Sequence, residues 1–435
     1  MLAGSRIVLT IGVVAVALLL AREDASADSL IVVRGNTAAM PVSPLCGVRT
    51  GSVAFISGFG LLERVQPGPN AREVRAAAGP RGFGLSWSAP GARAISAPLT
   101  AMRRLGKLTR HGTLNGNTDI AFGANGDRTV VWEAPEGVRL QRVGRDGLPG
   151  PRVLVRPRGD DALLDPEILA SPASGATWVA SYRDLAEDPM VTRVSAEGAP
   201  GRSISFPVRD TTPEGGLYDA IDDGRGGLYA LLFGFEPEII DRPGITTDDT
   251  SVDLIHVTAG GEVRRRAIGA NSSGALRAHL IATRGQPTIV YHQYREGSGG
   301  IFVRRAGRKD RLTKPRLIRK TGRVDDAAAS PRGTRLAVLI SLSSRGRSDV
   351  LLQRLSLDGR RLRGSSRVAA MRRRSRRAAS TLEGQALALT RGDDIVVRWA
   401  RVPRGGFESE VEYVRVMRRR SLGPSQTLWK CRSSD

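Results

Sequence analysis

The chain has 435 residues, of which 40% are hydrophobic, so it is long and apolar enough to bury a sizeable core. Its 51 glycines and 24 prolines argue against a helical protein and favour short strands joined by turns. The net charge of +23 favours polyanionic partners such as nucleic acid, anionic cell-wall polymers or anionic lipid surfaces. The basic residues are almost all arginine, which is equally typical of a GC-rich coding sequence.

The first 27 residues have the pattern of a secretory signal peptide. Arg6 makes the start positive, Ile7 to Ala21 is apolar, and Ala25-Ser26-Ala27 is a small-residue cleavage pattern. An uncleaved membrane anchor is the alternative, but this apolar run is shorter than the roughly 20 residues that span a bilayer. We therefore expect cleavage after Ala27, no membrane span afterwards, and a secreted or cell-envelope location.

The only cysteines are Cys46 and Cys431, near the two ends of the mature chain. Outside the cytosol two thiols can oxidise, and only one intramolecular disulfide is available to this pair. The alternative is two buried free cysteines. We predict the Cys46–Cys431 disulfide and, with it, ends that lie close together.

A short apolar strand that follows a glycine-containing turn recurs along the chain. The stretch from Gly126 to Trp132 is typical, and similar stretches end at Trp87, Trp132, Tyr182, Phe233, Tyr291, Ile340 and Trp399. Consecutive end residues are 45 to 59 positions apart, which is the length of a supersecondary repeat. Each repeat adds an alternating strand, a turn such as Asp146-Gly147, and a fourth strand.

Four short strands in about 50 residues are typical of a β-propeller blade. We predict an all-β, seven-bladed propeller of four-stranded antiparallel blades, closed near the termini, with six or eight blades left open as counts. Tandem β-sandwiches and a β-helix are the competing architectures. The expected division is a signal peptide at 1–27, a lead-in segment with a closing strand at 28–70, and the propeller domain at 71–435.

Two stretches resemble motifs of known propellers. Ser330-Pro331-Arg332-Gly333 is similar to the blade motif of TolB-type propellers, with Arg332 where aspartate is usual. Residues 171–178 resemble the Asp-box of sialidase-type propellers, with Ala173 in place of the aspartate. Each resemblance covers about eight residues and implies the β-propeller fold, with no specific family.

Few residues have the spacing of a catalytic or metal site. His111, His256, His279 and His292 lack metal-ligand spacing, and we expect structural roles, no metal and no cofactor. Asp219, Asp222 and Asp223 could offer oxygen ligands to Ca²⁺, although a solvated turn explains them better. A glycosidase would need two facing carboxylates. The available acids are Asp165, Glu167, Asp219, Glu236 and Glu238.

Charge is distributed unevenly along the chain. Residues 181–260 hold 6 basic and 15 acidic residues, whereas residues 301–380 hold 24 basic and 5 acidic ones, and we expect opposite sectors of the ring. The densest run comprises Arg360, Arg361, Arg363, Arg367, Arg372, Arg373, Arg374, Arg376 and Arg377. This run predicts a polyanion-binding sector, and a solvated loop between blades is the alternative.

Three functions remain open from the sequence. The first is a secreted, monomeric, non-enzymatic binding or scaffold module for an unknown protein or carbohydrate ligand. The second is an exported carbohydrate-active propeller enzyme of the glycosidase type, which a carboxylate pair in the central funnel would favour. The third is a cell-envelope protein that binds an anionic polymer through the arginine-rich sector.

Overall fold

A computed structural model describes most of the chain after the first 30 residues. The described residues are 31–42, 51–57, 60–68, 70–91, 93–100, 104–123, 125–157, 166–170, 175–181, 189–207, 214–235, 251–269, 275–283, 286–293, 299–330, 333–344, 347–362, 364–372, 380–402, 411–418 and 421–430. The expected signal peptide, Cys46 and Cys431 lie outside them. No helix in these ranges is long and apolar enough to cross a bilayer.

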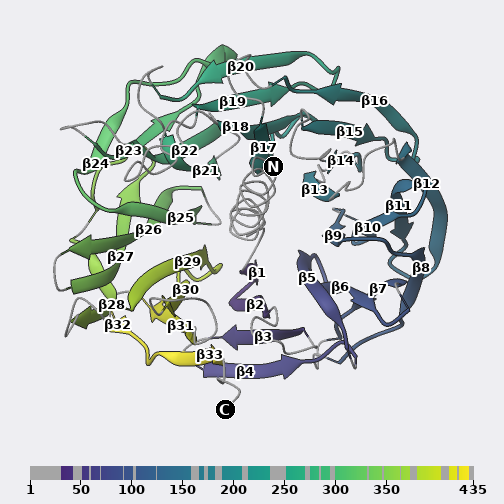
Figure 1. The fold of residues 1–435 in the computed structure, drawn as a ribbon, viewed down its shortest axis with the longest axis horizontal. Coiled ribbons are helices and arrows are strands. Elements are labelled where there is room, and N and C mark those ends of the chain that lie inside the picture. Colours follow the sequence, from purple (N-terminus) through teal and green to yellow (C-terminus); the bar gives the residue numbers. More distant parts are fainter. Residues whose placement is uncertain are drawn as a thin grey trace, which may run out of the picture.

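Eight antiparallel sheets stand around a common axis like the blades of a propeller (Figure 1). Blades 1 to 4 contain β1 (Val32–Arg34), β2 (Thr37–Val42), β3 (Ser52–Ser57), β4 (Gly60–Val65); β5 (Arg72–Gly79), β6 (Gly82–Ala89), β7 (Arg93–Pro98), β8 (Thr109–Thr113); β9 (Thr118–Phe122), β10 (Arg128–Ala134), β11 (Gly137–Val143), β12 (Pro149–Pro157); β13 (Glu167–Ala170), β14 (Thr177–Ser181), β15 (Met190–Val194) and β16 (Pro200–Ser205). In every blade the strands follow chain order from the axis outward (Figure 1).

Blades 5 to 8 repeat this plan. They contain β17 (Glu214–Asp222), β18 (Leu228–Phe235), β19 (Ser251–Val257), β20 (Val263–Ala267); β21 (Ala275–Thr283), β22 (Gln286–Gln293), β23 (Gly300–Arg305), β24 (Arg316–Arg319); β25 (Arg323–Ala329), β26 (Arg335–Ser344), β27 (Arg347–Ser356), β28 (Ser366–Arg372); β29 (Thr381–Leu389), β30 (Ile395–Val402), β31 (Val411–Arg418), β32 (Ser421–Leu422) and β33 (Gln426–Lys430). In blade 8 both β32 and β33 pair with β31. A 3-10 turn, η2 (Arg308–Asp310), joins β23 to β24.

The propeller prediction is confirmed, and the ring has eight blades, one of the counts left open. The seven glycine-and-apolar stretches correspond to the second strands of blades 2 to 8. The eighth blade is the first in the chain, and it is built from Val32 to Val65, within the segment expected as a lead-in. Its second strand, TAAMPV, has no aromatic residue and therefore lacks the recurring signature.

Glycine makes the tight turns that the repeat predicts. Gly126 has φ +88° in the turn before β10, and Gly147 has φ +83° in the turn between β11 and β12. These angles lie in the left-handed region, where a side chain would be strained. Gly198, Gly261 and Gly359 occupy the same turn in blades 4, 5 and 7, with φ between 80° and 92°.

Hydrophobic clusters between adjacent blades form the core. Trp132 is 1% exposed and packs with Ala77 and Ala94 of blade 2. Trp178 of blade 4 is equally buried and packs with Leu217 and Leu228 of blade 5. These two tryptophans of second strands therefore fill the spaces between neighbouring blades.

Blades 1 and 8 meet at a seam. Met40 and Ala54 of blade 1 pack with Val396, Val414 and Leu428 of blade 8. Across the described part of the seam no strand of one blade pairs with a strand of the other, because each sheet is a contiguous chain segment. Hydrogen bonds cross the seam. The backbone amide of Arg391 donates to the carbonyl of Gly35 at 2.7 Å, and Nη1 of Arg398 donates to the carbonyl of Pro41 at 2.9 Å. The ring thus closes where its terminal blades meet.

Candidate functional site

Arginines link consecutive blades by a repeated hydrogen bond. A buried residue at the outer strand of one blade presents its carbonyl to an arginine of the next blade. Nη1 of Arg304 lies 2.5 Å from the carbonyl of Ile268, Nη2 of Arg361 lies 2.5 Å from that of Ile318, and Nη1 of Arg415 lies 2.5 Å from that of Val368; Arg64 contacts the carbonyl of Leu428 across the seam. A carbonyl is neutral, so these guanidinium groups support the ring while keeping their full positive charge.

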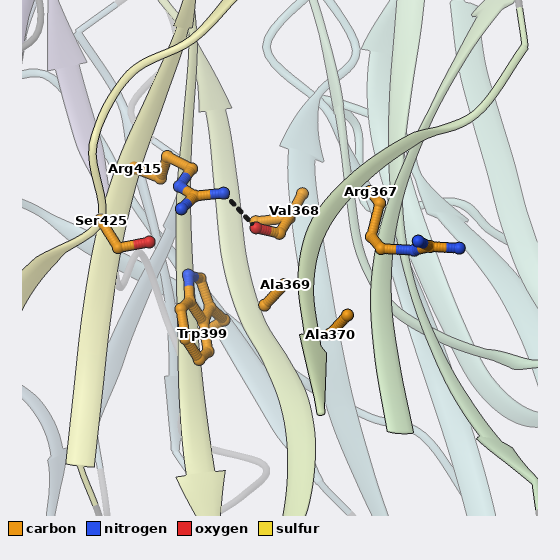
Figure 2. A pocket seen from close by; sticks show the side chains of 7 residues that line it. All are labelled: Arg367, Val368, Ala369, Ala370, Trp399, Arg415 and Ser425. Atoms are coloured by element: carbon orange, nitrogen blue, oxygen red, sulfur yellow. Dashed lines mark hydrogen bonds between the residues drawn. The ribbon is translucent and has the colours of Figure 1, made fainter. Parts of the chain in front are cut away.

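The link between Arg415 and Val368 borders a pocket of about 280 Å³ between blades 7 and 8 (Figure 2). One wall is the outer strand β28, which contributes Arg367, Val368, Ala369 and Ala370. The opposite wall is Trp399 of β30, Arg415 of β31 and Ser425, which precedes β33. Burial lowers the pKa of Arg415, but an arginine stays protonated at any ordinary pH.

Two hydrogen-bond donors in this pocket have no protein partner. Nε1 of Trp399 and Nε of Arg415 are buried and unbonded, although Nη1 of the same arginine is held by Val368. In Figure 2 the indole nitrogen lies on the side of Trp399 that faces Arg415. The indole is 8% exposed and stacks on Tyr413 with ring centroids 4.2 Å apart, which fixes its orientation. The pocket therefore presents preorganised N–H groups.

A second pocket of about 350 Å³ lies at the equivalent position between blades 5 and 6. It is lined by Arg266, Ala267, Arg304, Arg311 and Leu312. Here Nε of Arg304 donates to the carbonyl of Thr313 at 2.8 Å, so that arginine offers fewer unbonded donors than Arg415 does. Both pockets are basic because each forms beside an arginine that links two blades: Arg415 in the first pocket and Arg304 in the second.

The outermost strands β20, β24 and β28 form what we call the basic rim. Their sequences VRRRA, RLIR and SRVAAMR contain seven arginines and no acidic residue. Some of these charges are balanced by carboxylates: Arg316 lies 3.2 Å from Asp358, and Arg367 lies 3.5 Å from Asp349. Others meet neutral groups, as when Nε of Arg319 donates to the carbonyl of Thr321. The rim keeps an excess of positive charge.

The structure describes part of the predicted arginine run. Arg360 is largely exposed and pairs with Asp358 at 3.0 Å, Arg367 lines the pocket between blades 7 and 8, and Arg361 makes an inter-blade link. Arg372 ends β28. Arg363, Arg373, Arg374, Arg376 and Arg377 lie outside the described residues.

The expectation of opposite charge sectors is wrong. Residues 181–260 fall mainly in blades 4 and 5, and residues 301–380 fall mainly in blades 6 and 7. The acidic and basic blocks are therefore neighbours on the ring (Figure 1), because blades 5 and 6 follow each other in the chain and around the axis.

A titratable cluster lies on the innermost strands of three consecutive blades. Nδ1 of His279 in β21 lies 3.1 Å from Oδ2 of Asp219 in β17 and 3.7 Å from Oδ1 of Asp326 in β25. Burial disfavours the charged imidazole, but the hydrogen bond and charge of Asp219 outweigh it and raise the pKa of His279. Burial raises the pKa of Asp326 to about 6. The His279 side chain keeps 19% of its surface exposed although blades surround it.

Both carboxylates of this cluster also hold the backbone of the next blade. Oδ2 of Asp219 accepts from the amide of Leu280 at 3.2 Å, and Oδ2 of Asp326 accepts from the amide of Leu387 at 2.6 Å. Asp119 in β9 bonds the amide of Ile168 in the same way at 2.8 Å. The repetition in blades 3, 5 and 7 indicates an architectural role for these aspartates.

The histidines at 256 and 111 serve blade contacts. His256 stacks on Tyr229 at 4.0 Å and lies between Asp223 at 3.2 Å and Asp310 of blade 6 at 3.0 Å. His111 is fully buried: Nε2 lies 2.7 Å from Oγ of Ser96, and Nδ1 lies 2.9 Å from Oε1 of Gln141 in blade 3. Burial lowers the pKa of His111 to about 4, so the ring is neutral at pH 7.

The acidic stretch considered for Ca²⁺ forms a turn instead. Oδ1 of Asp223 accepts from the amides of Arg225 and Gly227, and Oδ1 of Asp222 accepts from the amide of Gly224. Asp219 is not part of this turn, because its carboxylate contacts His279. Within the described ranges no three histidine, cysteine, aspartate or glutamate side chains converge as metal ligands.

The candidate glycosidase carboxylates are only partly described. Asp165, Glu236 and Glu238 lie outside the described residues, and Glu167 begins β13. Asp219 approaches another carboxylate, that of Asp326, but the imidazole of His279 contacts both. A sugar would need the space that this imidazole occupies, so this pair does not form a glycosidase site.

No family model matches the chain, and no curated protein matches it either. Among solved structures, the WD40 domain of SCAP from fission yeast is similar, with a TM-score of 0.50 and 13% identity over 89% of this chain and 93% of that one. The Dos1 propeller aligns with a TM-score of 0.49 and 10% identity over 88% and 91%. The first of these likenesses supports the β-propeller fold and no specific family.

Proposed function

We propose that this protein is an exported, non-enzymatic binding module that holds an anionic polymer on its basic rim. The supporting observation is the set of outermost strands β20, β24 and β28, which carry seven arginines and no acidic residue on consecutive blades. Arginine side chains recognise sulfate, phosphate and carboxylate groups by charge and by their forked donors. A polymer of such groups, for example an acidic cell-envelope polysaccharide or a teichoic-type chain, can contact several blades at once.

The two basic pockets strengthen this proposal. They lie at the 5/6 and 7/8 interfaces, on both sides of the inter-blade link made by Arg361, and each contains an arginine bonded to a neutral carbonyl. Base-stacking aromatics are not exposed on the described rim: Trp399, in the wall of the pocket between blades 7 and 8, is buried. A flexible polyanion with pendant charged groups fits this surface better than single-stranded nucleic acid, which binds through stacked bases.

A binding experiment with matched variants tests the proposal. Arg266→Gln, Arg316→Gln and Arg319→Gln together remove three rim charges from β20 and β24. We expect weaker binding to heparin or wall teichoic acid, and a slope of log affinity against log salt that is smaller by about 2. The control combines Arg110→Gln, Arg152→Gln and Arg202→Gln on the outer strands of blades 2 to 4, which removes the same charge from the other side of the ring.

Equal losses in both triple variants would show that only the net charge matters, and would contradict a rim site. Unchanged binding in the rim variant would contradict it as well. Dextran, an uncharged polysaccharide, should bind neither protein.

Export and the Cys46–Cys431 disulfide are part of the same proposal. The strands before the two cysteines, β2 and β33, belong to the blades that meet at the seam. β33 pairs antiparallel with β31, which pairs antiparallel with β30, so β33 runs in the same direction as β30, the equivalent of β2. Both strands therefore end on the same face of the ring. Mass spectrometry of the secreted protein under non-reducing conditions should find Cys46 and Cys431 in one linked peptide pair, and free thiols at both would contradict it.

A further inference from the structure

We propose that the pocket between blades 7 and 8 is a binding site for a single oxyanion, namely a sulfate, phosphate or carboxylate group. The groups that face this pocket are hydrogen-bond donors: the indole N–H of Trp399, the guanidinium of Arg415 and the hydroxyl of Ser425. No acidic residue lines it. Such a set of donors, with the positive charges of Arg415 and Arg367 in the walls, suits an oxyanion, whose oxygens accept several hydrogen bonds at once.

The unbonded donors distinguish this pocket from an ordinary basic surface. Trp399 is 92% buried, since 8% of it is exposed, and its Nε1 has no partner. A buried donor without an acceptor costs about 1–3 kcal/mol, and here two such donors, Nε1 of Trp399 and Nε of Arg415, belong to one pocket. An oxyanion would satisfy both of them, which the protein alone does not.

The site is also rigid. Stacking on Tyr413 orients the indole, and the bond from Nη1 to the carbonyl of Val368 at 2.5 Å fixes the guanidinium of Arg415. Small side chains, Ala369 and Ala370, form the facing wall and leave room for the ligand (Figure 2). Arg367 extends away from the indole in the same view, and it pairs with Asp349. Preorganised donors bind without the entropic cost of ordering flexible side chains.

This inference does not depend on polymer binding at the basic rim, since the pocket could take a free anion or a pendant group of a polymer. The readout is the indole N–H resonance of Trp399 in a ¹H–¹⁵N NMR spectrum, assigned by its loss in Trp399→Phe. We expect a saturable shift with sodium sulfate at constant ionic strength, and no saturable shift with chloride. A sulfated disaccharide separates the two sources: stronger binding than sulfate would favour a pendant group, and equal binding a free anion, and either result supports the oxyanion site.

Three variants make the test specific. Ala370→Glu adds a carboxylate to the exposed wall without touching the inter-blade core, and should weaken sulfate binding about tenfold or more through repulsion. Leu148→Glu adds the same charge in blade 3, where Leu148 is 61% exposed, and should leave the Trp399 shift unchanged. Arg415→Lys should also lose the shift, with the thermal transition recorded to check that the blade link survives.

The absence of a saturable sulfate shift in the parent, or an equal shift in the parent and Ala370→Glu, would overturn the proposal. The outcome is separable from the polymer experiment. Loss of heparin binding in the rim variant with an intact sulfate shift supports both proposals, whereas heparin binding without a sulfate shift refutes only the oxyanion site.

Discussion

Nδ1 of His279 lies 3.1 Å from Oδ2 of Asp219, which belongs to the preceding blade of the ring. The same nitrogen lies 3.7 Å from Asp326 of the following blade, so one imidazole joins three blades. Together the two carboxylates outweigh burial and the nearby charge of Arg277, and the pKa of His279 is raised. This contact makes the stability of the ring depend on pH.

The first prediction concerns this histidine. Because the folded pKa exceeds the unfolded value of about 6.5, protonation stabilises the fold below pH 6.5, and the stabilisation is lost as the pH rises through the folded pKa. His279→Gln should therefore lower the free energy of unfolding more at pH 5.5 than at pH 9. Urea denaturation at both values measures it. An equal loss at the two values would mean that the imidazole is neutral in the fold.

His111 should show the opposite dependence. Its folded pKa of about 4 lies below the unfolded value, so its contribution is fully present above pH 6.5 and disappears as the pH falls towards 4. The lost stability amounts to about 3 kcal/mol. The difference in unfolding free energy between the parent and His111→Gln, followed from pH 7 to pH 4, should shrink over this window. A constant difference would contradict the prediction.

A buried ion pair lies at the seam between blades 8 and 1. Nη2 of Arg398 is 2.6 Å from Oε2 of Glu412, both side chains are about 5% exposed or less, and Nη1 holds the carbonyl of Pro41. Arg398→Met alone should cost about 3–5 kcal/mol, because it leaves a buried carboxylate unpaired. The double variant with Glu412→Met should recover part of that loss. Hydrogen exchange should accelerate first in β2 and β30. A double variant that loses the sum of the single effects would show that the two side chains are uncoupled.

Alanine substitutions at two glycines with nearly the same φ distinguish the cost of backbone strain from the cost of a steric clash. Gly359 has φ +80° and Gly91 has φ +79°. A β-carbon at Gly359 would collide with Val303 of blade 6, whereas nothing lies within 4 Å of one at Gly91. Gly91→Ala should cost about 1 kcal/mol, and Gly359→Ala about 2–4 kcal/mol. Thermal melts of the two variants give the comparison, and equal losses would mean that the turn relaxes without strain on blade 6.

The fold could largely be predicted from sequence because each blade carries its signal locally. A glycine at positive φ followed by an apolar strand recurs before the second strands of several blades, as at Gly126 before Trp132 and at Gly175 and Gly333. The first blade escaped this pattern because β2 has alanines where the others have large residues: Ala38 is fully buried at the seam with blade 8, and Ala39 is fully buried against blade 2. A repeat can be recognised in the sequence only where its second strand keeps the large apolar residues, and β2 does not keep them.

The candidate site was less accessible to sequence reasoning. Trp399 was recognised as a strand end, but its partner Arg415 and the wall of Ala369 and Ala370 lie 16 to 30 positions away and meet it only across a blade interface. The sequence contains so many arginines that those with a structural role cannot be recognised in it. Arg361 and Arg415 are distinguished only by their hydrogen bonds to a carbonyl of the preceding blade. The roles of Asp219 and Asp326 could not be predicted either, because each role consists of a hydrogen bond to a backbone amide of the next blade.

The contiguous blades have a consequence for the chain's connectivity. None of the described sheets contains a strand from the other end of the chain. The ring can therefore form whichever blade comes first in the sequence. A circular permutant that joins the region after β33 to the region before β1 and opens the chain between β16 and β17 would keep each blade whole and move the seam to the 4/5 interface. Rings of this kind can also gain or lose a blade by duplication or deletion of one gene segment, without repairing a shared sheet.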